Sequence, residues 1–282
     1  LGLVYLCGLK VEGVALGTLI AQYAGFLMGI ALWMHNYGRL KRLWEIKNYK
    51  LKIKGGEEAG IWEKGVMLRF FQVNRDIFLR TLCLVAVTLF FTSAGASQGE
   101  IILAVNTLLM QLFTLFSYVM DGFAYAGEAL SGRYIGARNR EAFTDTVRHL
   151  FGWGAVMAVL FTLVYALGGN AFLGLLTDDK EVIAVADTYF YWALAVPAVG
   201  IAAFIWDGIF IGATATRGML LSMAAAAVSF FILYYGLHPV LANHALWLAF
   251  LTYLLMRGVV QTGLSREVIR RAFPSKKEPA WR

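Results

Sequence analysis

Long apolar segments separated by short polar ones dominate the sequence. A helix that crosses a lipid bilayer needs about 20 mostly apolar residues. Seven segments meet this requirement, at residues 12–34, 66–92, 100–131, 148–169, 182–212, 218–237 and 243–262. Residues 1–9 are typical of the end of an earlier span. The pattern therefore predicts an all-α polytopic membrane protein.

The basic residues of the connections alternate from one crossing to the next. Lys and Arg number eight in 35–65, none in 93–99, four in 131–148, one in 170–181, one in 213–217, none in 238–242 and six in 263–282. Cytoplasmic loops of membrane proteins carry the excess of Lys and Arg. We therefore expect the basic connections and the C-terminus in the cytoplasm, and the acidic loop 177–181 outside.

Composition agrees with a membrane protein and narrows the possible functions. The chain is 59% hydrophobic and only 15% charged, whereas soluble domains are about 25% charged. Its net charge of +7 comes mainly from loops between apolar spans, so we expect no nucleic-acid partner. Cys7 and Cys83 both lie in apolar runs, without a disulfide or metal-ligand pattern. Without a nucleophile–base pair either, we expect neither an enzyme nor a cofactor.

The one long connection divides the chain into parts. We expect residues 1–34 to end one helical bundle, 35–65 to form a basic cytoplasmic linker, 66–262 to form a six-helix lobe and 263–282 to form a basic cytoplasmic tail. The linker is either solvated or amphipathic. In the second case, Trp44, Ile46 and Tyr49 would lie on anionic lipid headgroups.

Polar residues follow one face of the span at 100–131. They stand at spacings of three and four, as Thr107, Gln111, Thr114, Tyr118, Asp121, Tyr125 and Glu128. This spacing aligns them along a helix for about 32 Å. Such residues either join helices by hydrogen bonds or line a water-filled cavity. Two acids in one span favour the cavity, because ionisable groups inside a membrane are rare and functional. Asn106, beside this stripe, is a further candidate.

The span at 66–92 opens with a second polar stripe. Its residues are Arg69, Gln72, Asp76 and Arg80. Asp76 and Arg80 are four residues apart and can therefore neutralise each other inside the bundle. Asp76 is either half of this structural ion pair or a transport residue.

Asp207 stands alone in the apolar span at 182–212. Gly200 and Ala203 leave space on its helix face, and Pro197 is expected to kink the helix. A carboxylate without a partner in such a place favours its protonated form. We therefore expect Asp207 to exchange a proton or to hold a cation.

Three strings in these spans resemble multidrug and toxic compound extrusion (MATE) transporters, and among them the branch named after the DNA-damage-inducible protein F. They are LFTLFSYVMDGFAYAGEAL at 112–130, WDGIFIGAT at 206–214 and NRDIF at 74–78. Members of this family have twelve spans in two six-helix lobes. The resemblance implies that this chain holds the end of the fifth span, the sixth span, the linker and the whole second lobe.

The resemblance also implies a function, namely export of cationic, amphipathic compounds in exchange for protons or sodium. Asp207 matches the acid on the tenth helix of the family. Some sodium-coupled members have a Glu on the seventh helix, whereas residues 81–85 here contain no acid, so protons are the expected coupling ion. The expected partners are a small-molecule substrate, the coupling cation and the lipid bilayer. We expect a multi-pass protein of a bacterial inner membrane that is monomeric at full length.

The alternative within the same superfamily is a flippase for lipid-linked oligosaccharides. Such a protein needs several cationic residues in its cavity to bind pyrophosphate. The stripe from Thr107 to Glu128 contains acids and no Lys or Arg.

Overall fold

The structure, a computed structural model, describes residues 16–17, 19–35 and 64–274 of the chain. Most of the predicted linker 35–65, the beginning of the first span and the end of the tail lie outside these residues. The chain divides into two units, Leu1–Met67 and Leu68–Arg282. In the first unit, residues Leu19–His35 form an apolar helix, within the segment where a span was predicted.

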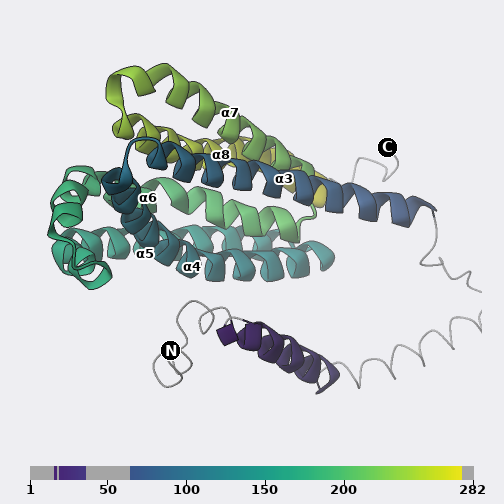
Figure 1. The fold of residues 1–282 in the computed structure, drawn as a ribbon. Coiled ribbons are helices and arrows are strands. Elements are labelled where there is room, and N and C mark those ends of the chain that lie inside the picture. The colour runs from purple at the N-terminus through teal and green to yellow at the C-terminus, as the bar shows by residue number, and fades with distance from the viewer. Residues whose placement is uncertain (1–15, 18, 36–63, 275–282) are drawn as a thin grey trace, which may run out of the picture. The chain divides into compact units, whose positions relative to one another are not determined.

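Six long helices make up the second unit (Figure 1). They are α3 (Lys64–Ala96), α4 (Glu100–Gly136), α5 (Arg140–Leu176), α6 (Lys180–Gly212), α7 (Thr216–Leu241) and α8 (Asn243–Ala272). All six are long and apolar enough to cross a membrane. They confirm the six spans predicted between 66 and 262 and extend them, most of all at α5, which begins eight residues before the predicted start and ends seven residues after the predicted end. The protein is an all-α polytopic membrane protein.

The turns between these helices are short, and their residues satisfy the free backbone groups at the helix ends. The Asp179 carboxylate accepts hydrogen bonds from the amides of Glu181 and Val182, at 2.9 and 3.3 Å. Asn139 caps α5 by accepting from the amide of Ala142 at 3.0 Å. These are side chains that commonly begin helices. The chain therefore reverses direction within a few residues, and consecutive helices return across the same thickness.

α6 is the central helix of the lobe and packs against α4, α5 and α8, while α7 packs on α8. Glycines allow its closest approach. A methyl group on Gly208 would overlap the backbone carbonyl of Ala124, and one on Gly212 would overlap that of Glu128. Small residues at such contacts are typical of membrane helices, because the helices associate through close packing rather than the hydrophobic effect. α4 and α6 are thereby fixed in register.

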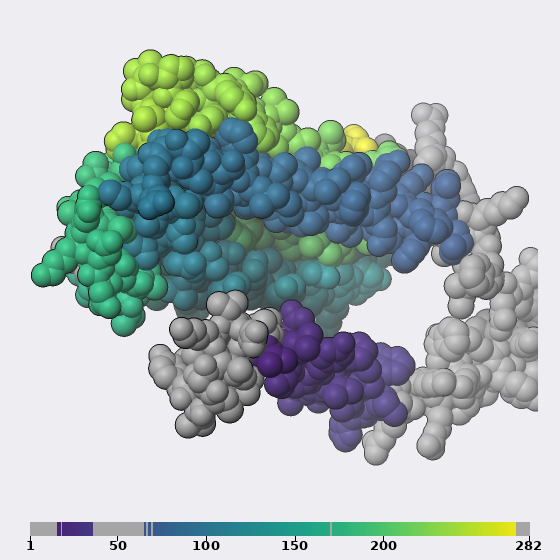
Figure 2. All heavy atoms as spheres, viewed as in Figure 1, coloured from purple at the N-terminus to yellow at the C-terminus, as the bar shows by residue number. Residues whose placement is uncertain are grey.

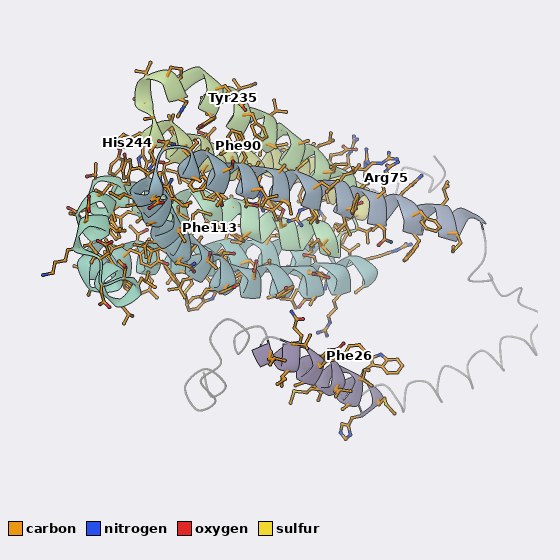
Figure 3. The ribbon with its side chains drawn as sticks, viewed as in Figure 1. Phe26, Arg75, Phe90, Phe113, Tyr235 and His244 are labelled. Carbon is orange, nitrogen blue, oxygen red and sulfur yellow. The ribbon has the colours of Figure 1, made fainter. Side chains whose placement is uncertain are left out.

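α3 runs along one face of the lobe (Figure 2) and contacts the other helices through side chains rather than by close backbone packing. The ring of Phe90 packs edge-on against four rings of α7, those of Phe230, Phe231, Tyr234 and Tyr235, with ring centroids 5.0–5.9 Å apart (Figure 3). Phe91 contacts Trp247 and Phe250 of α8 at 5.2 and 5.3 Å. Aromatic pairs of this geometry contribute about 0.5–1.5 kcal/mol each beyond the area that they bury.

We expect the turn at Asp179 outside the cell and the turn at Asn139 inside, because the turn at Asn139 lies among basic residues. The measurement is labelling of Asp179→Cys and Asn139→Cys with a membrane-impermeant thiol reagent, in the full-length protein without other cysteines. Asp179→Cys should react in intact cells and Asn139→Cys only after permeabilisation. The reverse order would invert the topology.

Gly208→Ala should destabilise the lobe by at least about 1–3 kcal/mol, the usual effect of overpacking, because the new methyl group meets backbone rather than a movable side chain. Gly122→Ala on α4 is the control, since nothing lies within 4 Å of the added carbon. Thermal unfolding of the full-length protein in detergent measures both. Equal melting temperatures for the two variants would show that α4 and α6 are not packed this closely.

Candidate functional site

A buried ionic cluster surrounds Asp207 of α6. This residue is 7% exposed. Arg80 of α3 and Arg257 of α8 both donate from Nη2 to its Oδ2 atom, Arg257 at 2.7 Å. Gln261, one turn after Arg257, donates to Oδ1 at 2.5 Å. Three helices therefore meet at one carboxylate.

The expectation that Asp207 is a carboxylate without a partner is therefore wrong. The missing information lay in α3 and α8, which are distant in sequence. With two guanidinium groups beside it, the carboxylate is stabilised in its ionised form, and the three charges sum to one positive charge. α6 continues through Pro197, so the residues before and after this proline belong to one helix.

Arg257 is held more firmly than Arg80. Its guanidinium lies 5.5 Å from the ring centre of Tyr253 and 5.8 Å from that of Phe204, and its side chain is 6% exposed. The side chain of Arg80 is 20% exposed. The Nε atoms of both arginines are buried without a hydrogen-bond partner among the described residues. The cluster therefore has one fixed cation and one that is more accessible.

The predicted ion pair between Asp76 and Arg80 is also wrong. Arg80 extends to Asp207 instead. Asp76 is 2% exposed; its Oδ1 pairs with Arg75 at 3.0 Å, and its Oδ2 accepts from Thr216 of α7 at 3.2 Å. Asp76 therefore joins α3 to α7, and a spacing of four residues did not decide its partner.

The polar stripe of α4 lies on the side of the helix that faces away from the core of the lobe. Tyr118 and Tyr125 are 71% and 70% exposed, Thr107 and Gln111 are exposed, and Thr114, Asp121 and Glu128 are partly buried. The opposite face packs into the core through Val105, Leu109, Leu112, Phe116 and Met120. Within the described lobe, the stripe is therefore mainly an open surface rather than a set of interhelical hydrogen bonds.

Asp121 connects this surface to the buried cluster. It lies one turn before Ala124, whose carbonyl meets Gly208, the residue after Asp207. The stripe and the cluster are therefore neighbours, and two acids and two arginines together are electrically neutral.

Asn106, the remaining candidate, is 2% exposed and belongs to a separate network. Asn106 and Asn243 exchange two hydrogen bonds of 2.8 and 3.0 Å between their amides. The Asn106 oxygen also accepts from Trp247 Nε1 at 2.8 Å. These bonds join the beginnings of α4 and α8 and occupy the side chain of Asn106.

Sequence reasoning missed Arg257 and Gln261. Both are polar residues in the last predicted span, four residues apart and therefore on one helix face. That spacing was the available signal. Their partner, Asp207, lies at least 50 residues away along the chain, and only the packing of α6 against α8 identifies it.

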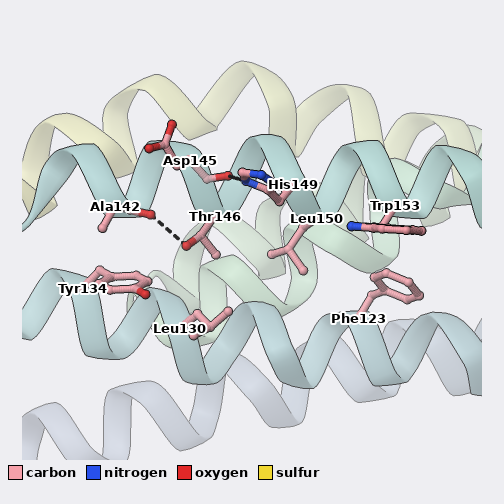
Figure 4. Close-up of a pocket in the computed structure, with 9 residues that line it drawn as sticks. All are labelled: Phe123, Leu130, Tyr134, Ala142, Asp145, Thr146, His149, Leu150 and Trp153. Atoms are coloured by element: carbon pink, nitrogen blue, oxygen red, sulfur yellow. Dashed lines mark hydrogen bonds between the residues drawn. The ribbon is translucent and has the colours of Figure 1, made fainter.

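Two pockets lie outside this site. A cavity of about 410 Å³ between α4 and α5 includes Phe123, His149 and Trp153 (Figure 4). The polar groups of Thr146 and His149 there contact carbonyls of their own helix at 2.7 Å. A second cavity, of about 670 Å³, opens where α3 begins and α8 ends, with Asp76 and Thr216 in its lining. Among the site candidates Asp76, Asn106, Gln111, Tyr118, Asp121, Tyr125, Glu128 and Asp207, only Asp76 lines either of these two pockets.

A family described as MatE matches residues 77–240, which include most of α3 and all of α4 to α6. This match covers more than half of the chain. The chain belongs to the MatE family. The family resemblance is thereby confirmed.

Relatives of this MatE chain come from bacteria and plants. It is 39% identical over 251 residues to DNA damage-inducible protein F of Escherichia coli K12. The matched segment covers 89% of this chain and 52% of that protein. It is 21% identical over 260 residues to Protein DETOXIFICATION 42 of Arabidopsis thaliana, 91% of this chain and 46% of the relative. A shorter match, 26% over 133 residues, links 47% of the chain to 24% of Protein DETOXIFICATION 45, chloroplastic, of the same plant. The chain spans about half the length of its bacterial relative.

Asp207→Asn should destabilise the lobe by about 3–5 kcal/mol, because it leaves two buried guanidinium groups without a counter-ion. Arg80→Gln should have a much smaller effect, since Arg257 still compensates the carboxylate. Thermal unfolding of the full-length protein measures both. The double variant Asp207→Asn with Arg257→Met should recover part of the loss. If Asp207→Asn unfolded at the wild-type temperature, the cluster would not be buried as described.

Proposed function

We propose that the chain is the second lobe of a secondary active exporter, which moves cationic, amphipathic organic compounds outwards in exchange for a cation. One observation supports this most strongly. The polar face of α4 is open along its length and lies beside a buried group of charges. A surface of this kind suits the wall of a water-filled pathway, because so many polar groups are costly against lipid.

The chemistry of this face favours an organic cation over an anion. Tyr118 and Tyr125 offer exposed aromatic rings, which attract cations through their π faces. Asp121 and Glu128 add negative charge, and no Lys or Arg lies between Thr107 and Glu128. A pyrophosphate-linked sugar would meet acids there, so the flippase alternative is the weaker one.

We propose a proton as the coupling ion. Residues 81–85 of α3 contain no acid to complete a sodium site beside Asp207. The cluster instead holds Asp207 with two arginines and one amide. Asp121 is the more accessible of the two acids, and it lies one turn before Ala124, whose carbonyl meets Gly208 beside Asp207. A proton or a substrate that binds at Asp121 would therefore change the electrostatic balance of α3, α6 and α8 together.

We also propose that the full-length protein lies in a bacterial inner membrane, as a monomer whose C-terminus is cytoplasmic. The basic residues around Arg138 and Arg140 and those at the end of α8 support this orientation. The relative in Escherichia coli K12 supports the bacterial setting.

Tyr118→Cys in the full-length protein, with Cys7 and Cys83 replaced, should react with a hydrophilic thiol reagent, and ethidium, a cationic amphipathic dye, should slow the reaction. Leu160→Cys on α5 is a matched control. It is also exposed, at 47%, and its neighbour Phe161 contacts Phe116 of α4, so it lies at a similar depth. It should not react, because its surroundings are apolar.

The transport arm uses Asp121→Asn, which should lower ethidium efflux from a susceptible host at least tenfold at unchanged abundance, whereas Asp121→Glu should retain part of the activity. Equal reactivity at positions 118 and 160, together with full efflux in Asp121→Asn, would refute the proposed pathway.

A further inference from the structure

The two arginines around Asp207 are not equivalent. A single carboxylate requires only one of them for charge balance. Both place Nη2 on the same oxygen of Asp207. A single guanidinium already neutralises one carboxylate. The second adds a positive charge in a buried place, where uncompensated charge is expensive. The cluster thus contains a cation whose presence the ion pair alone does not explain.

Arg80 is the less firmly held of the two. Arg257 shares its helix with Gln261, which binds the other oxygen of Asp207, and two aromatic rings flank its guanidinium. Arg80 comes from α3. This helix takes little part in the close backbone packing among the five helices from α4 through α8. Its side chain is also the more exposed of the two.

The excess charge of Arg80 is balanced by Asp121. This acid on the open face of α4 lies one turn before Ala124, whose carbonyl meets Gly208, the residue after Asp207. None of the described ion pairs includes it. Two carboxylates and two guanidinium groups sum to zero. A cationic substrate that approaches Asp121 therefore meets a group whose negative charge Arg80 already offsets.

We propose that Arg80 acts as an internal cation, which neutralises the Asp121–Asp207 acid pair in this state and so competes with the transported cation for it. The inference rests on the proposed function and adds a named competitor to it. Removal of Arg80 leaves the acid pair with only Arg257 and hence one net negative charge. An organic cation then binds more tightly, because Arg80 no longer competes with it for the acids. Its binding also no longer displaces Arg80, so transport falls while binding tightens.

The experiment measures binding of tetraphenylphosphonium, a permanently charged amphipathic cation, to the purified full-length transporter in detergent by equilibrium dialysis. Arg80→Gln should bind it roughly tenfold more tightly than the wild type, since one nearby positive charge is lost, while efflux of the same cation from cells falls. Arg80→Met, which keeps the apolar part of the side chain, should behave alike, and Arg80→Lys should bind as the wild type does. Arg75→Gln, on the same helix and 58% exposed, is the control and should leave binding unchanged.

Each result decides between the two proposals. If the wild type binds tetraphenylphosphonium but Arg80→Gln and Arg80→Met bind it no more tightly than Arg75→Gln, the role of Arg80 is refuted and the export function stands. Tighter binding with undiminished efflux would also refute it, because Arg80 would then take no part in coupling. If neither the wild type nor any folded variant binds the cation, the proposed export of organic cations fails, and the role of Arg80 fails with it.

Discussion

Burial of the Asp207 carboxylate is the constraint on which the rest of the lobe depends. A charge in the interior of a membrane bundle must be paired and hydrogen-bonded, because water is not available to solvate it. Here the partners come from α3 and α8 while the acid belongs to α6. Those three helices are therefore bound to one another by an interaction that apolar packing does not provide.

Close packing around α6 supports this cluster. Gly208 follows Asp207 directly and lies against the carbonyl of Ala124 in α4, while Gly258 follows Arg257 and lies against Ala202 and Ala203 of α6. Asp207 and Arg257 are thus each followed by a glycine at a helix contact. The helices are close because the glycines lack side chains. At this short distance the charged side chains contact each other directly.

α4 has two faces with different tasks. Its apolar face is buried against α6 through residues such as Phe116, whose ring contacts Phe204 with centroids 5.9 Å apart. Its polar face remains open at Tyr118 and Tyr125. Asp121 on this polar face lies one turn before Ala124, whose carbonyl meets Gly208 beside Asp207, so the open surface and the ionic cluster are neighbours.

The sequence by itself determined the spans, the all-α class, the family resemblance and the polar face of α4. These follow from local regularities: apolar length predicts a span, and spacings of three and four define a helix face. The two faces of α4 in the structure agree with that spacing, since exposed Tyr118 and buried Phe116 follow from helix geometry alone.

Only the tertiary structure decided which charges meet. Arg80 and Asp207 are 127 residues apart, and Asp207 and Gln261 are 54 apart. Sequence spacing paired Arg80 with Asp76, its neighbour one turn away, and left Asp207 without a partner. The long guanidinium side chain reaches another helix as easily as the next turn of its own, so the packing of α3, α6 and α8 selects its partner, and no local pattern contains that information.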